Sequence, residues 1–180
     1  AVFISGTGSN LKNLINFSKT KKSSISIDLI ISNTIKAKGL KYSNQYKIKK
    51  KILNFKNIRI AEKRLLNLLK QNKIQFICLA GFMKILSSKF IKQFNGKIIN
   101  IHPSLLPRYR GLNTHSRAIQ NKDKFTGCSV HYVTEKLDSG KIIIQKKIKI
   151  LKKDTPKSLA KKVLKQEHKL YPKAILKIFN

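Results

Sequence analysis

The chain has few acidic residues, few cysteines and no tryptophan. Of its 180 residues, seven are Asp or Glu and two are Cys, whereas 40 are Lys or Arg. Cys78 and Cys128 lie in apolar runs without a Cys-x-x-Cys spacing, so we expect buried thiols rather than a disulfide or a zinc site. No apolar run approaches the roughly 20 residues of a membrane-spanning helix, so we expect no membrane association and a cytoplasmic location.

The basic residues give the chain a formal net charge of +33. Such a charge raises the hypothesis of a nucleic-acid-binding module. However, only five of the cations are Arg, and the lysines are spread along the whole sequence rather than clustered. A dedicated nucleic-acid surface uses Arg for bidentate contacts and aromatic residues for stacking. We therefore expect no specific nucleic-acid partner and keep the binding module as the alternative.

Apolar runs alternate with helical patterns along the chain. We expect strands at residues 2–4, 25–32, 76–80, 97–101, 126–134 and 141–149. We expect helices from about residue 10, at 36–46, 58–72, 87–94 and 115–121, and from about residue 154 onward. This alternation predicts an α/β fold with a doubly wound, mostly parallel sheet of the Rossmann-like type, formed by residues 1–180 as a single domain. Ligands of such folds bind beyond the carboxyl ends of the strands.

The first predicted strand is followed by a glycine-rich segment, "SGTGSNL". Glycines between a strand and a helix let backbone N–H groups approach an anion at the helix N-terminus. The dinucleotide fingerprint is incomplete, because Leu11 stands at the place of its third glycine. Asp28 also lies at the start of its strand rather than at the end, where it could reach a ribose. The segment therefore indicates a single phosphate, with a tight structural turn as the other interpretation.

The run "NIHPSLLPRYRG" places two polar side chains at the end of a strand. Because side chains alternate along a strand, Asn100 and His102 share one face while Ile101 points to the other. Pro103 then ends the ladder pairing. An amide donor beside an imidazole suits a reaction in which an oxyanion forms and a proton moves. A satisfied structural histidine is the other interpretation.

Asp138 lies in the turn "LDSG" between the last two predicted strands. A carboxylate there can reach the histidine of a neighbouring strand, where it would fix the ring and favour the imidazolium form. Ordinary turn chemistry explains an Asp at this position equally well. His131 is expected to face the same pocket, and no acidic or cysteine cluster supports a metal site.

Five segments in this order resemble the signature segments of a known family. The segments are "ISGTGSNL", "LAGFMKILS", "INIHPSLLPRYRGLNTH", "GCSVHYVTEKLDSGKII" and "QEHKLYP". They resemble the phosphoribosylglycinamide formyltransferases, a branch of the folate-dependent formyltransferases, from residue 2 to about residue 173. The resemblance implies the formyltransferase fold and transfer of a formyl group from 10-formyltetrahydrofolate to glycinamide ribonucleotide in purine biosynthesis.

The resemblance also implies roles for individual residues. The catalytic residues would be Asn100, His102 and Asp138. The ribonucleotide would be bound by Gly8, Ser9, Asn10 and Glu167, although a lone Glu in a Lys-rich helix is otherwise interpreted as a solvated partner of lysines. The folate would be bound by Met83, Lys84, Ile85, Leu86 and Asn100.

In the implied reaction, Asn100 and protonated His102 stabilise the oxyanion, and Asp138 raises the pKa of His102. The partners are then the two small-molecule substrates, 10-formyltetrahydrofolate serves as co-substrate, and no metal is required. The chain is expected to act as a monomer or homodimer. Within the same family, the other possibility is another folate-dependent formyltransferase or hydrolase of the methionyl-tRNA formyltransferase-like type. The usual Gly-Ala-Ala-Pro type segment of methionyl-tRNA formyltransferase is replaced here by "GLNTH".

Overall fold

The computed structural model describes residues 1–179, and the chain divides into two compact units. The first unit comprises residues 1–99, and the second begins at Asn100. The boundary falls inside strand β5 (Lys97–His102), so the polar residues at the end of that strand belong to the second unit.

The first unit contains four parallel strands in the order β3-β2-β1-β4. Their bounds are Val2–Ile4 for β1, Leu29–Ser32 for β2, Lys49–Ile52 for β3 and Phe76–Leu79 for β4. β1 and β2 are buried along their whole length, as is usual for parallel strands with both faces covered. Because the strands run in one direction, the loops that follow β1 and β4 leave the sheet at the same edge.

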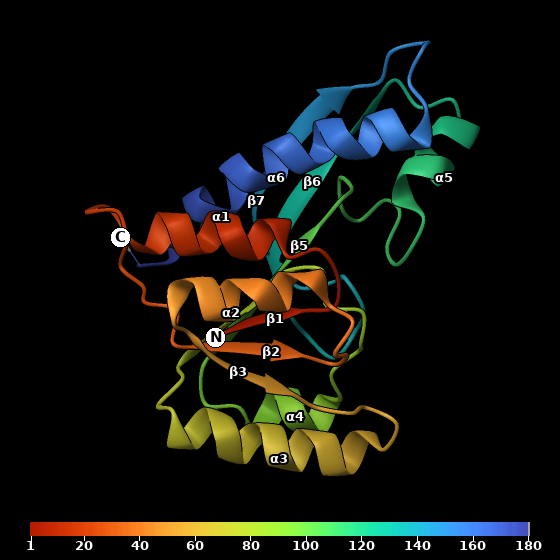
Figure 1. The fold of residues 1–180 in the computed structure, drawn as a ribbon. Helices are drawn as coiled ribbons and strands as arrows, with labels where there is room; N and C mark the ends of the chain where they lie inside the picture. Colours follow the sequence, from red (N-terminus) through yellow and green to blue (C-terminus); the bar gives the residue numbers. More distant parts are fainter. Residues whose placement is uncertain (180) are drawn as a thin grey trace. The chain divides into compact units, whose positions relative to one another are not determined.

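Helices cover both faces of this parallel sheet. Figure 1 shows α1 (Ser9–Ser18) and α2 (Lys41–Tyr46) on one side of the strands, and α3 (Ile58–Gln71) and α4 (Ser88–Gln93) on the other. A 3-10 helix, η1 (Lys38–Leu40), lies against α1 and α2. The arrangement of helices on both faces agrees with the predicted doubly wound sheet.

One face of α3 packs into the core. Ala61, Leu65 and Leu69 are buried, whereas Leu68 is only half-buried. Glu62, which no sequence pattern distinguished, is buried on the same helix. Both carboxylate oxygens of Glu62 accept hydrogen bonds from Ser87, the N-cap residue of α4, with the backbone N–H at 2.7 Å and the hydroxyl closer still. Glu62 therefore holds the beginning of α4 against α3.

Two predicted elements of the first unit need correction, and one strand was missed. The strand expected at residues 25–32 begins only at Leu29, because local hydrogen bonds of Ser23 and Ser26 hold the preceding residues in an irregular conformation. The helix expected at 36–46 is divided into η1 and α2. Strand β3 was not predicted, because all four of its residues are exposed and give no apolar pattern.

The second unit combines an antiparallel strand pair with a long helix. β6 (Phe125–Tyr132) pairs with β7 (Ile142–Lys149), and the register shifts between Val130 and His131. The helix α6 (Pro156–Phe179) lies against both strands and against α5 (Thr114–Gln120) (Figure 1). The predicted helix start near Pro156 and the end of β5 at His102, directly before Pro103, are both confirmed.

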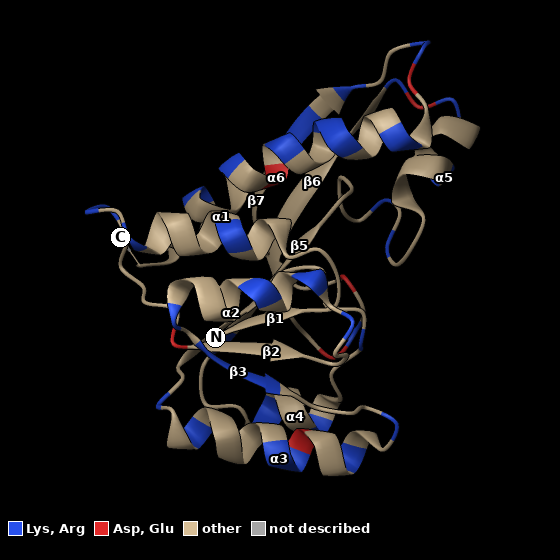
Figure 2. Cartoon of the chain, in the orientation of Figure 1, with Lys and Arg blue, Asp and Glu red and all other residues tan. Residues whose placement is uncertain are grey.

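The positive charge is distributed over many elements rather than gathered on one. Figure 2 shows Lys and Arg on helices of both units and along β3. Three of the four residues of the exposed strand β3 are Lys, and charge on such a strand prevents pairing with another chain. Within residues 1–179, no helix combines the length and apolar character that crossing a bilayer requires.

The contact between Glu62 and Ser87 predicts a measurable contribution to folding. Glu62→Ala should lower the free energy of unfolding by about 1–3 kcal/mol, because it leaves polar groups at the start of α4 without their carboxylate partner. Urea denaturation checks this value. Lys63→Ala, at the exposed neighbouring position, should change it by less than about 0.5 kcal/mol. Equal effects of the two substitutions would contradict the assigned role of Glu62.

Candidate active site

Three polar side chains of the second unit meet around the carboxylate of Asp138. Asp138 Oδ2 lies 3.3 Å from His102 Nδ1 and accepts the backbone N–H of Gly111 at 2.9 Å. Asp138 Oδ1 lies 3.4 Å from Asn100 Nδ2 and 3.6 Å from His131 Nε2. We call Asn100, His102, His131 and Asp138 the Asp138 cluster. The predicted shared face of Asn100 and His102 is confirmed, since both contact the same carboxylate.

Local structure places each member of the cluster. Asn100 and His102 are alternate residues of β5, and His131 lies on β6 beside the register shift. Asp138 occupies the turn between β6 and β7 with a φ of 46°, a left-handed conformation that Asp tolerates better than most residues. Gly111 also has a positive φ, 76°, so a side chain at this position would strain the N–H that reaches Asp138.

A buried hydroxyl holds the loop that follows β5 against the strand pair. Ser129 on β6 donates to the carbonyl of Ser104 at 2.6 Å and accepts the backbone N–H of Leu106 at 3.1 Å. Gln145 on β7 donates to the same hydroxyl at 2.8 Å and to the carbonyl of Leu106 at 2.9 Å. These bonds fix the chain immediately after His102. Nothing in the sequence pattern distinguished Ser129 or Gln145 from ordinary strand residues.

Both ring nitrogens of His102 face hydrogen-bond acceptors. Nε2 lies 2.8 Å from the carbonyl oxygen of Tyr109, and Nδ1 faces Asp138. Both groups only accept, but the contact of Nε2 with the carbonyl is the shorter one. The geometry therefore favours a neutral ring that carries its proton on Nε2 and leaves Nδ1 free to take up a second proton. That proton would at once have Asp138 as its acceptor. The geometry therefore prepares Nδ1 for proton uptake.

Burial has the largest effect on the pKa of His102 and lowers it below the usual 6.5. The Tyr109 carbonyl and Asp138 act in the opposite direction but do not outweigh burial. The expectation that Asp138 raises the pKa is thus correct for its direction, but burial outweighs it and the net pKa is lowered. With a pKa below 6.5, the ring is neutral at pH 7.

Asp138 is ionised in this environment. Burial raises the pKa of Asp138. The neighbouring His131, the Gly111 N–H and His102 together lower it by more than burial raises it, so the net pKa lies below the usual 3.8. His131 donates through Nδ1 to the carbonyl of Tyr132 at 2.8 Å. Its Nε2 lies 3.3 Å from the amide nitrogen of Asn100. His131 was expected in this pocket, and its contacts confirm that placement.

The residues expected to bind the phosphate lie at the start of α1 in the first unit. Gly8 is the N-cap of α1 with a φ of 73°, Ser9 is the first helical residue, and Asn10 is buried. A Cβ at Gly8 would lie 2.6 Å from the Cα of Gly39. Gly8 is therefore required for the close approach of η1 whether or not a phosphate binds. A substitution at Gly8 cannot distinguish a phosphate loop from a structural turn.

The residues expected to bind folate follow β4 in the same unit. Met83 is 62% exposed and Ile85 is 63% exposed, whereas Leu86 is buried and contributes its side chain to the core. Lys84 is exposed. The backbone N–H of Met83 donates to the hydroxyl of Ser5 at 2.8 Å, which ties this segment to the loop that begins the glycine-rich run. Two exposed apolar side chains on an anchored loop suit contact with a ligand.

Glu167 lies on α6 in the second unit, and it is 7% exposed. The interpretation of Glu167 as a solvated partner of surface lysines is therefore wrong. Burial, followed by the charge of Glu167, raises the pKa of the Cys128 thiol to about 12. Neither Cys78 nor Cys128 forms a disulfide, and both are buried, as predicted.

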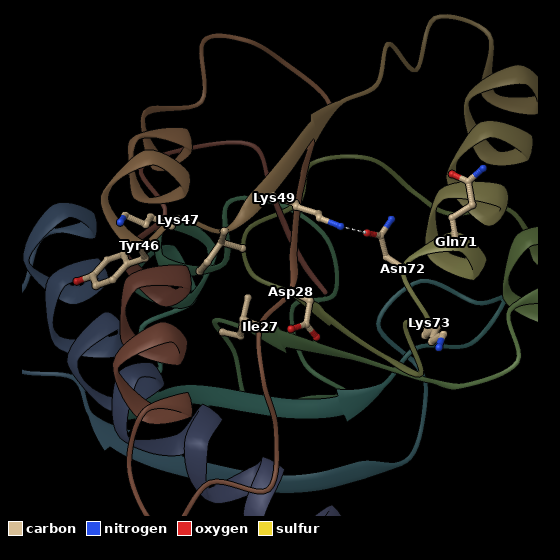
Figure 3. A pocket seen from close by; sticks show the side chains of 9 residues that line it. Ile27, Asp28, Tyr46, Lys47, Lys49, Gln71, Asn72 and Lys73 are labelled. Atoms are coloured by element: carbon tan, nitrogen blue, oxygen red, sulfur yellow. Dashed lines mark hydrogen bonds between the residues drawn. The ribbon is translucent and has the colours of Figure 1, made fainter.

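A cavity of about 530 Å³ in the first unit lies away from these residues. It is formed at the start of β2 and β3 and after the end of α3. The Lys49 ammonium donates to the side-chain oxygen of Asn72 at 3.3 Å. Figure 3 shows this pair beside Asp28 and Lys73. These positions are at the amino ends of the strands, whereas Gly8 follows a carboxyl end. None of the predicted site residues lines this cavity.

An amide, two imidazoles and a carboxylate at the end of a strand suit transfer of an acyl group. The chain belongs to the formyl transferase family, whose model matches residues 1–175. The resemblance inferred from the five sequence segments is therefore confirmed.

Two relatives illustrate the family. The chain is 38% identical to the phosphoribosylglycinamide formyltransferase of Escherichia coli (strain K12), over 97% of this chain and 84% of that protein. It is 41% identical to the trifunctional purine biosynthetic protein adenosine-3 of Homo sapiens, over 97% of this chain. The chain spans only 18% of the length of the human protein.

Solved structures of the same kind share the fold. The phosphoribosylglycinamide formyltransferase from Brucella melitensis superposes with a TM-score of 0.93 at 40% identity, over 98% of this chain and 93% of that chain. The enzyme of the same name from Anaplasma phagocytophilum gives 0.90 at 41% identity, over 97% and 82%. These similarities confirm the predicted fold class, an α/β fold with a mostly parallel sheet.

The lowered pKa of His102 leads to a prediction for its titration. In the wild type, NMR should give a His102 pKa below 6.5, and Asp138→Asn should lower it further, because the substitution removes a group that raises it. Since the folded pKa lies below the unfolded one, the contribution of His102 to stability is complete above about pH 6.5 and is lost as the pH falls through the folded value. A His102 pKa that rises in Asp138→Asn would contradict the assigned contact.

Proposed function

We propose that this chain transfers the formyl group of 10-formyltetrahydrofolate to the primary amine of glycinamide ribonucleotide. The Asp138 cluster carries the proposal, because it joins an amide donor, a titratable imidazole and an ionised carboxylate in a member of the formyl transferase family. Relatives that bear the name phosphoribosylglycinamide formyltransferase support the choice of acceptor.

The proposed reaction begins with attack of the amine nitrogen on the formyl carbon. The carbonyl double bond becomes an oxyanion, and the amide N–H of Asn100 stabilises the negative charge. Collapse of the oxyanion restores the carbonyl and breaks the bond to N10 of the folate. The products are the formylated ribonucleotide and tetrahydrofolate.

The proposed role of His102 is to take up the proton that the attacking amine loses. The free Nδ1 accepts it, and the resulting imidazolium donates to Asp138 while its charge also stabilises the oxyanion. His102 then returns the proton to the leaving nitrogen of the folate. A ring that is neutral before the reaction and charged during it fits a pKa somewhat below neutral pH.

The binding roles are proposed for each unit by itself. In the first unit, Gly8, Ser9 and Asn10 bind the phosphate of the ribonucleotide at the start of α1, and Met83, Lys84, Ile85 and Leu86 bind the folate. In the second unit, Asn100 also contacts the folate, and the buried carboxylate of Glu167 accepts hydrogen bonds from the ribose hydroxyls.

We further propose that residues 1–180 act together as one formyltransferase domain. The similarity to the Brucella melitensis enzyme over 98% of the chain supports this proposal. Small-molecule partners, the absence of a specific nucleic-acid partner, a monomeric or homodimeric state, a cytoplasmic location and a reaction without metal remain predictions. Within residues 1–179, no group of three or more His, Cys, Asp and Glu side chains is placed to share a metal ion.

The catalytic proposal predicts a large loss of turnover when His102 is removed. Steady-state formyl transfer by the purified chain should be measurable with glycinamide ribonucleotide but not with methionyl-tRNA as acceptor. His102→Ala should lower kcat by roughly 10²–10⁴ with little change in KM, the range for loss of one positioned acid–base group. His168→Ala, a histidine on α6 outside the Asp138 cluster, serves as control. Unchanged turnover in His102→Ala would exclude the proposed mechanism.

The phosphate-binding proposal is tested by adding a charge at the start of α1. Ser9→Asp should stabilise the helix by about 0.3–1 kcal/mol, since a carboxylate in the first turn interacts well with the helix dipole. The same carboxylate should repel the phosphate and weaken ribonucleotide binding at least tenfold in calorimetry, with folate binding unchanged. Ser24→Asp adds the same charge at an exposed position as a control. Unchanged ribonucleotide affinity in Ser9→Asp would show that this helix start does not bind the phosphate.

A further inference from the structure

Tyr109 adopts a backbone conformation that bulky residues rarely occupy. Its φ is 54°, in the left-handed region where a side chain crowds the backbone. Such a conformation persists only when the surroundings hold it in place. The residue lies in the loop after β5, seven positions beyond His102 and two before Gly111. Both of those residues contact Asp138.

The carbonyl group of Tyr109 makes a contact with the Asp138 cluster. Its oxygen lies 2.8 Å from His102 Nε2, closer than Asp138 Oδ2 lies to Nδ1. This bond favours the neutral form of His102 that carries its proton on Nε2. It also fixes the rotation of the ring, and with it the direction in which Nδ1 faces Asp138.

The side chain of Tyr109 is anchored on the opposite side of the loop. Its hydroxyl donates to Asp123 Oδ2 at 2.7 Å and accepts the amide N–H of Asn121 at 2.9 Å. Asp123 in turn binds Arg108 through Oδ1 at 2.8 Å. The guanidinium groups of Arg108 and Arg117 lie 5.2 Å and 5.0 Å from the centre of the Tyr109 ring.

Apolar packing does not explain this anchoring. Tyr109 is only half-buried, and it lines a cavity of about 300 Å³ together with Leu105, Phe125 and Lys147. A residue with open space beside it and a strained φ depends on its polar contacts to stay in place. The bond between the Tyr109 hydroxyl and Asp123 is the strongest of these, because it is short and joins a charged acceptor.

We propose that Tyr109 is a positioning residue for His102, held in its left-handed conformation by Asp123 so that its carbonyl orients the imidazole. The inference rests on the proposed function only for the expected change in the rate of formyl transfer. The orientation of His102 is a property of the protein without substrates. Loss of the anchor would let the carbonyl move away from Nε2 and would weaken the bond that fixes the ring.

The variants Tyr109→Phe and Asp123→Asn remove the anchor while they preserve the size of each side chain. Neither changes the groups whose charges act on His102, which are Asp138, His131 and Arg117 together with the nearby His115. Asp28→Asn makes the same change of charge as Asp123→Asn at an exposed position of the first unit and serves as control. Tyr109→Gly relieves the strained φ but also removes the anchor.

We expect both anchor variants to lower the His102 pKa in an NMR titration, because the bond to the Tyr109 carbonyl raises it. Solvent exchange of the Nε2 proton should become at least about tenfold faster. In formyl transfer, kcat should fall about 10- to 100-fold, the range typical of groups that orient a functional residue, with KM for both substrates nearly unchanged. Tyr109→Gly should show the same losses, and Asp28→Asn none.

The proposal would be overturned if His102 in the folded variants Tyr109→Phe and Asp123→Asn had the same pKa and the same proton exchange rate as in the wild type. Wild-type behaviour of Tyr109→Gly would also overturn it, since it would show that the side chain does not hold the carbonyl. If the wild type transfers no formyl group, the proposed function fails. The two NMR measurements would then still decide whether Tyr109 positions His102.

Discussion

The candidate active site depends on one carboxylate, that of Asp138. It accepts the Gly111 N–H, faces an imidazole nitrogen through each of its oxygens, and lies within 3.4 Å of the Asn100 amide. These contacts come from β5, from β6, from the loop after β5 and from the turn that contains Asp138 itself. Without this carboxylate, Asn100, His102 and His131 would lose their common partner. Three residues that contact this site, Tyr109, Gly111 and Asp138, have positive φ.

Burial and charge act against each other within this cluster. Burial disfavours the charged form of both His102 and Asp138, but the neighbouring donors are sufficient to keep Asp138 ionised. At His102, burial outweighs the attraction of this carboxylate, so the ring is neutral at pH 7 beside a negative charge. This combination gives an imidazole that can accept a proton and at once share it with a carboxylate. A site that was charged on both partners from the start could not take up a proton in this way.

The sequence predicts most of the fold because its parallel strands are apolar and continuous. β1, β4 and β5 were located within one or two residues, and Pro103 marks the end of β5 correctly. The exposed strand β3 escaped detection, because a strand without a buried face has no apolar period to recognise. Asn100 and His102 could be placed on one face from strand geometry alone, since the period of two leaves no other choice.

Other features of the site could not be predicted, for identifiable physical reasons. The N–H of Gly111 and the carbonyl of Tyr109 are backbone groups, and residue identity does not reveal where they point. Burial of Glu62 and Glu167 depends on tertiary packing, which a local pattern of charges does not report. The direction of the His102 pKa shift could not be predicted either. It depends on whether the effect of burial or the effect of the nearby Asp138 charge on the pKa is larger, and this balance is set by the packing around the ring.

A double-mutant cycle on the formyl-transfer rate tests directly whether Asp138 and His102 act as one unit. The four enzymes are the wild type, His102→Ala, Asp138→Asn and the double variant. Since groups that act together are strongly non-additive, the double variant should be hardly slower than the slower single variant. Losses in the two single variants that multiply in the double variant would show instead that the two residues act independently.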